Sequence, residues 1–157
     1  MYEIERKFLV TEPVAKIVKN ARAILHIEQR YLKGHSGEWS IRIRQTIRDN
    51  KPVYYQTMKR SIATASCIEL ETEITPEFYQ TMAMQCGPAL RKTRYEILVG
   101  EHIWEVDVFK DINLVMAEIE LESVKEKFEM PAWAGKEVTT KKRYANKNLA
   151  KRIKKAV

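Results

Sequence analysis

Charged side chains stand at alternate positions in several segments of this chain, and their types suit a phosphate ligand held with a divalent cation. Guanidinium groups grip phosphate oxygens through paired hydrogen bonds, and carboxylates are the hard oxygen ligands that Mg²⁺ prefers. A spacing of two residues puts each set on one face of a β-strand. The sets are Glu3-x-Glu5-x-Lys7, Arg42-x-Arg44, Tyr55-x-Thr57-x-Lys59, Glu69-x-Glu71-x-Glu73, Lys92-x-Arg94-x-Glu96, Glu105-x-Asp107 and Glu118-x-Glu120-x-Glu122.

Apolar residues occupy the intervening positions, and this alternation predicts roughly eight β-strands. The strands are expected at 2–10, 23–33, 38–48, 52–60, 67–74, 90–99, 102–110 and 113–122. Helices are few. Pro13 is expected at the first position of a short helix through about residue 20, Thr75 caps a second helix that ends by Gly87, and residues 144–155 form a third. No repeat or linker divides the chain, so residues 1–157 are expected to form one domain.

The charged strand faces allow two interpretations. In the first, an open antiparallel sheet turns them to solvent, where each cross-strand ion pair contributes at most about 1 kcal/mol. In the second, the sheet closes into a barrel whose apolar face points outward under the helices and whose charged face lines a wet lumen. A lumen that binds a polyanion together with a metal ion needs both charge signs, whereas a solvated face does not. The pattern alone leaves the two interpretations open.

The composition is that of a folded protein, with 45% hydrophobic and 31% charged residues among 157. Its net charge of +7 is concentrated in residues 136–157, which hold nine Lys or Arg and one Glu. No base-reading motif accompanies this segment, so we interpret it as a solvated final helix and expect neither nucleic acid nor a membrane as partner. No apolar run approaches the roughly 18 residues that span a bilayer, and the first residues lack a signal-peptide pattern, which predicts a cytoplasmic protein. Cys67 and Cys86 have no partner base and are expected to be reduced and non-catalytic.

The charged motifs, in their order along the chain, resemble the CYTH domain family, also called the triphosphate tunnel metalloenzymes. The opening Glu3-x-Glu5-x-Lys7 looks like that family's signature. The later matches are Gln29-x-Tyr31, Arg42-x-Arg44, Thr57-x-Lys59, Glu69-x-Glu71, Lys92-x-Arg94, Asp107, Glu118-x-Glu120 and the segment from Trp133 to Ala150. The resemblance implies an α+β, mainly β fold: an eight-stranded antiparallel closed tunnel, open at both ends, with a charged lumen and a few flanking helices. It also implies Mg²⁺ or Mn²⁺ as cofactor and a small-molecule triphosphate as substrate.

The resemblance and the chemistry of the side chains together assign roles. Substrate phosphates are expected on Lys7, Arg42, Arg44, Lys59 and Arg94. Glu3, Glu5 and Glu120 look like the family's metal carboxylates, with Glu118 and Asp107 as neighbours that could hold a second ion or water. Lys92 and Tyr31 are the expected catalytic pair, since a Lys in a crowded cationic tunnel can have its pKa lowered enough to accept a proton.

Three functions remain open at this point. The leading hypothesis is metal-dependent hydrolysis of inorganic triphosphate, because the chain has no obvious segment that recognises a nucleoside. The alternatives are a class IV adenylate cyclase, which uses the same grip on a triphosphate, and a non-catalytic polyphosphate or nucleotide binder. Closure of the barrel leaves no edge strand to pair, although the resemblance to short relatives keeps a homodimer open.

Overall fold

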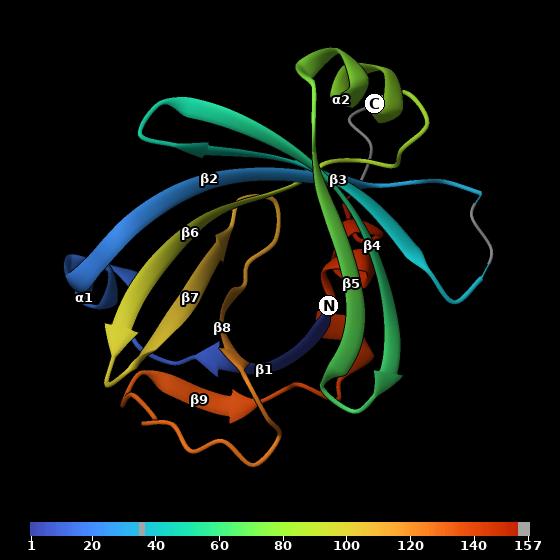
Figure 1. Cartoon of the computed structure of the whole chain (residues 1–157). Coiled ribbons are helices and arrows are strands. Elements are labelled where there is room, and N and C mark those ends of the chain that lie inside the picture. The colour runs from blue at the N-terminus through green and yellow to red at the C-terminus, as the bar shows by residue number, and fades with distance from the viewer. Residues whose placement is uncertain (35–36, 154–157) are drawn as a thin grey trace.

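A single antiparallel sheet closes on itself to form a barrel in the computed structural model, which describes residues 1–34 and 37–153 (Figure 1). The strands pair in the order β5-β4-β3-β2-β6-β7-β8-β1, and β1 pairs back to β5. This closed eight-stranded ring confirms the predicted fold class. The strand bounds are β1 Tyr2–Val10, β2 Ala21–Tyr31, β3 Ser40–Arg48, β4 Lys51–Ala63, β5 Ser66–Ile74, β6 Leu90–Val99, β7 His102–Phe109, β8 Val115–Leu121 and β9 Ala134–Glu137.

The first strand closes the barrel and also carries the extra strand. Residues Tyr2–Ile4 of β1 pair with β5, Ile4–Leu9 pair with β8, and Phe8 and Val10 pair with β9. Because β5 pairs with only the first part of β1, the same edge stays open along the second part, and β9 fills it. The sequence patterns did not predict β9, since four residues with a Gly among them show no alternation.

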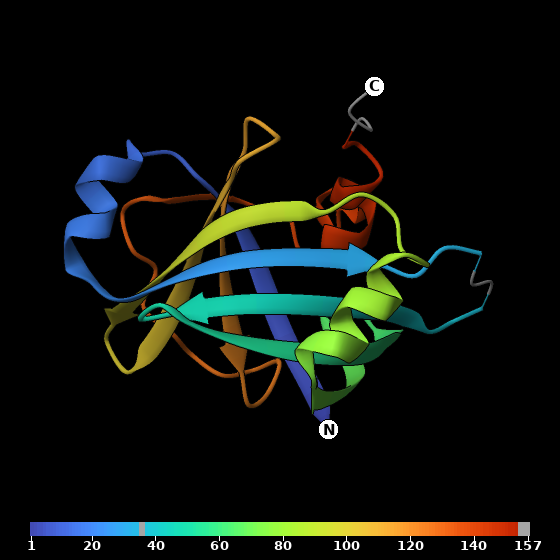
Figure 2. The same ribbon diagram turned by 90° about the horizontal axis from the view of Figure 1, so that it is seen from above.

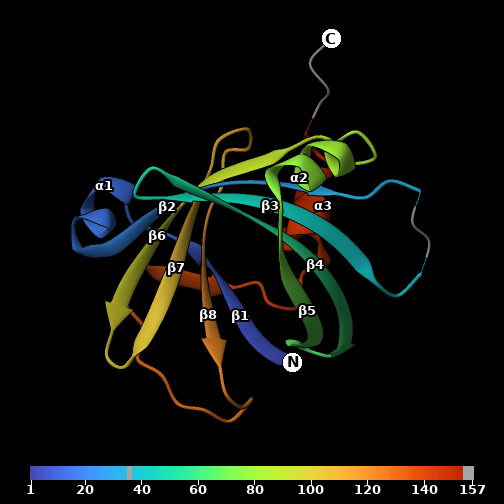
Figure 3. The ribbon, with the colours of Figure 1, turned by 45° about the horizontal axis from the view of Figure 1, so that its top comes forward.

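The helices are short and lie at the two ends of the barrel (Figures 2 and 3). At one end, α1 (Val14–Ile17) continues into the 3₁₀ turn η1 (Val18–Asn20), with Pro13 as the N-cap rather than the predicted first helical residue. At the other end lie α2 (Pro76–Ala83) and α3 (Asn146–Ala150). The Thr75 hydroxyl accepts the Phe78 N–H as the predicted cap of α2. Within the described residues, no helix is both long and apolar enough to cross a membrane.

The predicted C-terminal helix over 144–155 is wrong in its extent. A 3₁₀ turn, η2 (Lys142–Tyr144), is separated from α3 by Ala145, whose extended backbone (ψ 133°) interrupts the helical path. Helix α3 then ends at Ala150, and residues 154–155 lie outside the described residues. Tertiary packing rather than helix propensity sets these limits, since Leu149 and Ala150 are buried and their basic neighbours are not.

Apolar side chains on the outer faces of β1, β6, β7 and β8 form the largest core. Trp104 is fully buried at its centre, with ring centroids 5.4 Å from Phe8, 5.7 Å from Phe128 and 5.5 Å from Trp133. Ile17 of α1 packs on the same cluster. The apolar strand faces therefore point outward, as the barrel interpretation predicted, but the chain from Phe128 to Ala134 supplies much of the cover in place of helices.

Helix α3 covers one end of the barrel. Leu90 and Met116 lie on the same strand faces as the charged Lys92 and Glu118, yet both are fully buried against Leu149 and its neighbours in α3. At the opposite end, the inward-facing positions 98 and 103 pair across β6 and β7, and their side chains are 55% and 39% exposed. The resemblance implied a tunnel open at both ends. In this structure one mouth is wide, and α3 covers much of the other.

Candidate active site

The inward-facing charged side chains line one cavity of about 350 Å³ inside the barrel. Every strand from β1 to β8 contributes to its wall, which excludes the open-sheet interpretation. Among the described residues, its basic side chains are Lys7, Arg42, Arg44, Lys59, Lys92 and Arg94. Its acidic side chains are Glu3, Glu5, Glu69, Glu71, Glu105, Glu118 and Glu120. All the predicted site residues except Tyr31 and Asp107 therefore share this one cavity.

A fully buried ion network forms the wall of the cavity on β1, β6, β7 and β8. The Asp107 carboxylate, 0% exposed, accepts hydrogen bonds from Arg94 Nε at 2.7 Å and Nη2 at 2.8 Å, and from the Lys92 ammonium. Arg94 also reaches Glu118 at 3.2 Å, and Lys7 Nζ donates to the other oxygen of Glu118 at 2.9 Å. Asp107 lies behind the cavity lining with both oxygens occupied by protein cations. Its geometry is that of a buttress for Lys92 and Arg94, whereas the sequence placed it beside a metal ion.

Burial and neighbouring charges shift the pKa values of the side chains in this wall, and the shifts differ in direction from one carboxylate to the next. Burial alone raises the pKa of Glu118, but Lys7, Lys92 and Arg94 outweigh it and hold that pKa well below its usual range. Burial and the neighbouring Arg94 cation lower the pKa of Lys92. Glu105, which pairs with Arg94 at the outer part of the wall, has its pKa raised to about 7, because burial, Glu118 and Asp107 outweigh the arginine. Lys92 and Glu105 are thus two side chains of this wall whose pKa values move toward neutrality.

The opposite wall, on β3, β4 and β5, carries two arginines that share one acid. Arg42 and Arg44 both donate to Glu71, at 3.4 and 3.2 Å, and the Thr57 hydroxyl donates to the same carboxylate at 2.7 Å. Burial and the Arg42 charge lower the pKa of Arg44. The Nε atoms of both arginines are buried without a hydrogen-bond partner. Because buried donors are nearly always paired, these two N–H groups are suited to oxygens of a ligand.

Carboxylates gather where β1, β5 and β8 meet. Glu3 pairs with Lys59, and Glu5 pairs with Lys7 at 2.5 Å. Partial burial raises the pKa of Glu120, and the neighbouring Glu3, Glu5 and Glu69 raise it further. Within residues 1–34 and 37–153, no three metal-binding side chains already converge into a site. The donor set nevertheless fits a hard divalent cation, because it supplies carboxylate oxygens whose mutual repulsion such a cation relieves.

The structure does not bring the expected catalytic pair together. The β2–β6 register places Lys92 opposite Ile27, four residues before Tyr31. The Lys92 ammonium is bound to Asp107, while the Tyr31 hydroxyl accepts a hydrogen bond from Gln29 at 2.9 Å and faces a second chamber described below. Alternation fixes which face of a strand a residue lies on, but it does not fix the register between neighbouring strands. The sequence therefore could not predict the β2–β6 register.

Glu105, Tyr55 and Asn146 are among the lining residues to which sequence reasoning assigned no role. Glu105 carried a usable signal, since it alternates with Asp107 on the charged face of β7. Tyr55 also alternates with Thr57 and Lys59, and its ring lies 5.7 Å from the Arg44 guanidinium. Asn146 had no such signal: it lies at the start of α3 and reaches the cavity only because that helix packs on the barrel. Cys67, expected to be inert, donates to Glu3 at 3.0 Å, and burial and that contact raise its pKa to about 12.

Comparison with known proteins places the chain in a family. Residues 1–154 match the family model of the CYTH domain. The chain belongs to the CYTH domain family. Two curated relatives, each named inorganic triphosphatase, match this CYTH protein over nearly their whole lengths. The one from Acetivibrio thermocellus is 36% identical over 153 residues, 95% of this chain and 93% of the relative. The one from Nitrosomonas europaea is 34% identical over 156 residues, 96% of this chain and 97% of the relative.

Solved structures with the same barrel support this assignment. The crystal structure of the inorganic triphosphatase NE1496 aligns with a TM-score of 0.63 and 31% identity, covering 94% of this CYTH protein and 93% of that chain. A putative adenylyl cyclase from Hippeastrum, whose structure is described as revealing a dominant triphosphatase activity, aligns with a TM-score of 0.60, covering 77% of this chain and 80% of that one. At 16% identity, the second likeness extends to the fold alone.

Proposed function

We propose that this protein hydrolyses inorganic triphosphate in the barrel cavity, with Mg²⁺ or Mn²⁺ as cofactor. The observation that carries the proposal is the charge balance of the cavity, where six basic side chains face seven acidic ones. This lining has no surplus of positive charge to neutralise a triphosphate. Phosphoryl transfer depends on charge neutralisation and placement, so the carboxylates are understood as ligands for divalent cations that accompany the substrate. The two relatives named inorganic triphosphatase support the same substrate.

Arg42 and Arg44 grip the phosphate chain in this proposal. Each has a buried Nε–H without a partner, and each shares Glu71 instead of having a carboxylate of its own. A phosphate oxygen satisfies that donor and forms a charge-assisted hydrogen bond, which is about twice as strong as a neutral one. Lys59 and Lys7, which face the carboxylates of β1, hold the other side of the chain.

Glu3, Glu5 and Glu120 hold the cation, and Glu118 lies next to them. These residues come from β1 and β8, which pair through Glu5 and Glu120, so two adjacent strands would supply the ligands. When bound, a divalent cation neutralises charge on the phosphate oxygens and on the leaving group. The carboxylate crowding that raises the pKa of Glu120 supports this assignment.

Lys92 accepts the proton of the attacking water. Burial and Arg94 lower the pKa of its ammonium, which favours the neutral amine that a base requires, and Asp107 holds the side chain in place. The new P–O bond forms from this water, the terminal phosphoanhydride bond breaks, and orthophosphate and pyrophosphate result. Arg94 stays bound to Asp107, Glu118 and Glu105 and lines the cavity beside Lys92.

The lining of the cavity favours an inorganic substrate over a nucleotide, because its charged side chains far outnumber the apolar Leu25 and Ile27. A cyclase additionally needs a surface that recognises the adenine and the ribose of ATP. Release of phosphate from triphosphate, ATP and thiamine triphosphate, measured side by side with Mg²⁺ and with Mn²⁺, tests the proposal.

We expect fast release from triphosphate that stops on chelation of the metal. Tight binding of triphosphate without release indicates a non-catalytic binder, and cyclic AMP formation from ATP indicates the cyclase. Glu5→Gln removes one charge with little change in shape, so it is expected to give a folded protein with nearly no activity. Full activity of Glu5→Gln at ordinary Mg²⁺ concentration removes Glu5 from the metal site.

A further inference from the structure

A second chamber, of about 370 Å³, adjoins the main cavity beside α3. It lies between the start of β3, the tip of the β4–β5 hairpin and the first residues of α3. The two spaces share the side chains of Glu5, Lys7, Arg42, Lys59 and Asn146, so these side chains lie at the boundary between them. This chamber is the opening that remains at the barrel end covered by α3.

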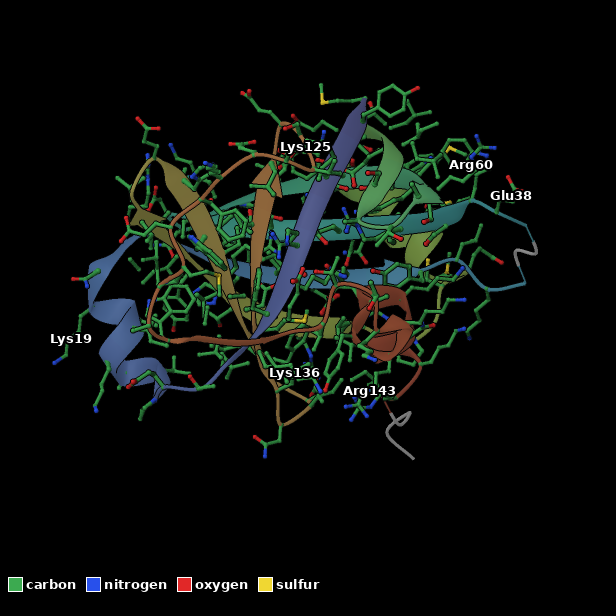
Figure 4. The ribbon with its side chains drawn as sticks, turned by 90° about the horizontal axis from the view of Figure 1, so that it is seen from below. Lys19, Glu38, Arg60, Lys125, Lys136 and Arg143 are labelled. Carbon is green, nitrogen blue, oxygen red and sulfur yellow. The ribbon has the colours of Figure 1, made fainter. Side chains whose placement is uncertain are left out.

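The charge of the chamber differs from that of the main cavity. Among the described residues that line it, the basic side chains are Lys7, Arg42, Lys59 and Lys147, and the acidic ones are Glu5 and Glu38. At the rim, Arg60 Nη1 donates a hydrogen bond to Glu38 Oε2 at 3.0 Å. Figure 4 shows these two side chains side by side, at the opposite side of the view from Lys19 (Figure 4). Glu3, Glu69 and Glu120, which line the main cavity, do not line this chamber. The chamber therefore favours an anion that needs no divalent cation.

Neutral hydrogen-bonding groups complete the chamber wall. Ser40, Ser61 and Ser66 line it together with small alanines, which leave the space open. The Tyr31 hydroxyl accepts a hydrogen bond from Gln29, so its own O–H remains to donate toward the chamber. Burial raises the pKa of Tyr31, which keeps this donor protonated. Hydroxyl donors beside several cations suit a phosphate group, which carries about −1.5 to −2 charges at pH 7.

We infer that this side chamber binds the orthophosphate product and is its route out of the barrel. The inference rests on the proposed triphosphatase function, because the phosphate arises in the adjoining cavity. Arg42 and Lys59 line both spaces, so a phosphate freed from the end of the chain passes from one to the other without losing these cations. Lys7 and Lys59 are paired with Glu118 and Glu3, so the phosphate is assigned to the unpartnered Nε–H of Arg42 and to Lys147, which lies on α3 at the exit.

Two variants outside the proposed catalytic residues test the inference, with one control. Lys147→Ala removes the exit cation, and Ala63→Phe fills the chamber at the end of β4. Lys151→Ala is the control, since it removes an exposed lysine one helical turn further along that does not line the chamber. Binding of inorganic phosphate to the metal-free full chain is measured by calorimetry, and product inhibition by orthophosphate is measured during turnover.

We expect one phosphate to bind each wild-type chain without metal. Lys147→Ala should weaken this binding about 3- to 5-fold, as for one exposed cation, and raise the inhibition constant of orthophosphate but not that of pyrophosphate. Ala63→Phe should abolish the binding while the melting temperature stays near the wild-type value, and Lys151→Ala should match the wild type.

Three outcomes separate this inference from the proposed function. Phosphate binding that is unchanged in both chamber variants but lost in Arg44→Ala places the phosphate in the main cavity and overturns the inference. An absence of phosphate binding in a protein that hydrolyses triphosphate also overturns it. Chamber-dependent binding in a protein that releases no phosphate refutes the proposed function and retains the chamber as a phosphate site.

Discussion

Asp107 offers a quantitative test of whether a lumen-side carboxylate is a metal ligand or an internal support. Asp107→Asn keeps the shape of the side chain but leaves Lys92 without its anion and Arg94 with only Glu105 and Glu118, in a wall whose Lys92, Arg94, Asp107 and Glu118 are 0–8% exposed. Removing one partner of a buried ion pair destabilises a protein by about 3–5 kcal/mol, because the other charge stays buried and unpaired. For a domain of this size, each kcal/mol lowers the melting temperature by roughly 2–4 °C, so the expected decrease is roughly 6–20 °C.

The chain contains a matched control for this prediction. Asp111 meets Arg91 through the same pair of guanidinium contacts, both at 3.3 Å, but the Arg91 side chain is 52% exposed. Asp111→Asn should therefore cost only about 0–1 kcal/mol. Urea unfolding of both variants and of the wild type, at pH 7 and with chelator present, measures the difference. Equal losses in the two variants refute the argument from burial.

A calorimetric Mg²⁺ titration completes the test. Since Asp107 has both oxygens occupied by Lys92 and Arg94, the folded Asp107→Asn protein should keep its metal affinity to within a few-fold. A variant that keeps its stability and loses its Mg²⁺ affinity establishes Asp107 as a ligand, as its sequence motif first suggested.

Four further predictions follow from single features of the structure. Arg44→Ala removes one charge-assisted contact of roughly 1.5–3 kcal/mol and should raise KM for triphosphate about 10- to 150-fold; an unchanged KM removes Arg44 from the phosphate grip. Lys92→Ala should lower kcat by roughly 10²–10⁴ and flatten the alkaline rise of the pH–rate profile, and an unaltered profile with only KM changed makes Lys92 a phosphate ligand. Because the pKa of Glu105 is raised from 4.5 to about 7, the folded state retains a proton that the unfolded state loses in this range. Wild-type stability should therefore fall as pH rises from about 4.5 to 7, and Glu105→Gln should show a shallower fall in thermal melts, whereas identical slopes contradict the raised pKa. A methyl group at Gly135 would lie 2.5 Å from Thr11 Cγ2, so Gly135→Ala should cost about 1–3 kcal/mol, while Gly87→Ala, whose nearest contact is 3.8 Å, should be nearly neutral by urea unfolding.

The strands and their facing were predictable because alternation is a local property. Each residue pair such as Arg42 and Arg44 is placed on one face by the pleat, whichever strand lies next to it. Closure of the barrel then brings Glu3 and Glu120 to the same cavity, although more than a hundred residues separate them. The charged lumen could therefore be predicted before any pairing between strands was known.

Depth and register were not predictable in this way. Alternation puts Asp107 on the inward face, but only packing decides that it lies behind the lining and not in it. The offset between β2 and β6 separates Tyr31 from Lys92, and no feature of either strand fixes that offset. The position of helix α3 over the barrel end was also not predictable from the sequence. It depends on the apolar surface that Leu90 and Met116 form together, and this surface exists only in the folded protein.

The use of β1 by three partners has a consequence for how the chain folds. Its contacts reach across most of the sequence, from Tyr2 with Ile68 to Arg6 with Glu137. During synthesis β1 is made first, and its backbone groups become fully paired only after β5, then β8 and finally β9 have been made. Proteins dominated by such distant pairings fold slowly, and unpaired strands meanwhile can join other chains. The charged residues of β1 that later serve the lumen, Glu3, Glu5 and Lys7, therefore also discourage aggregation while the barrel is still open.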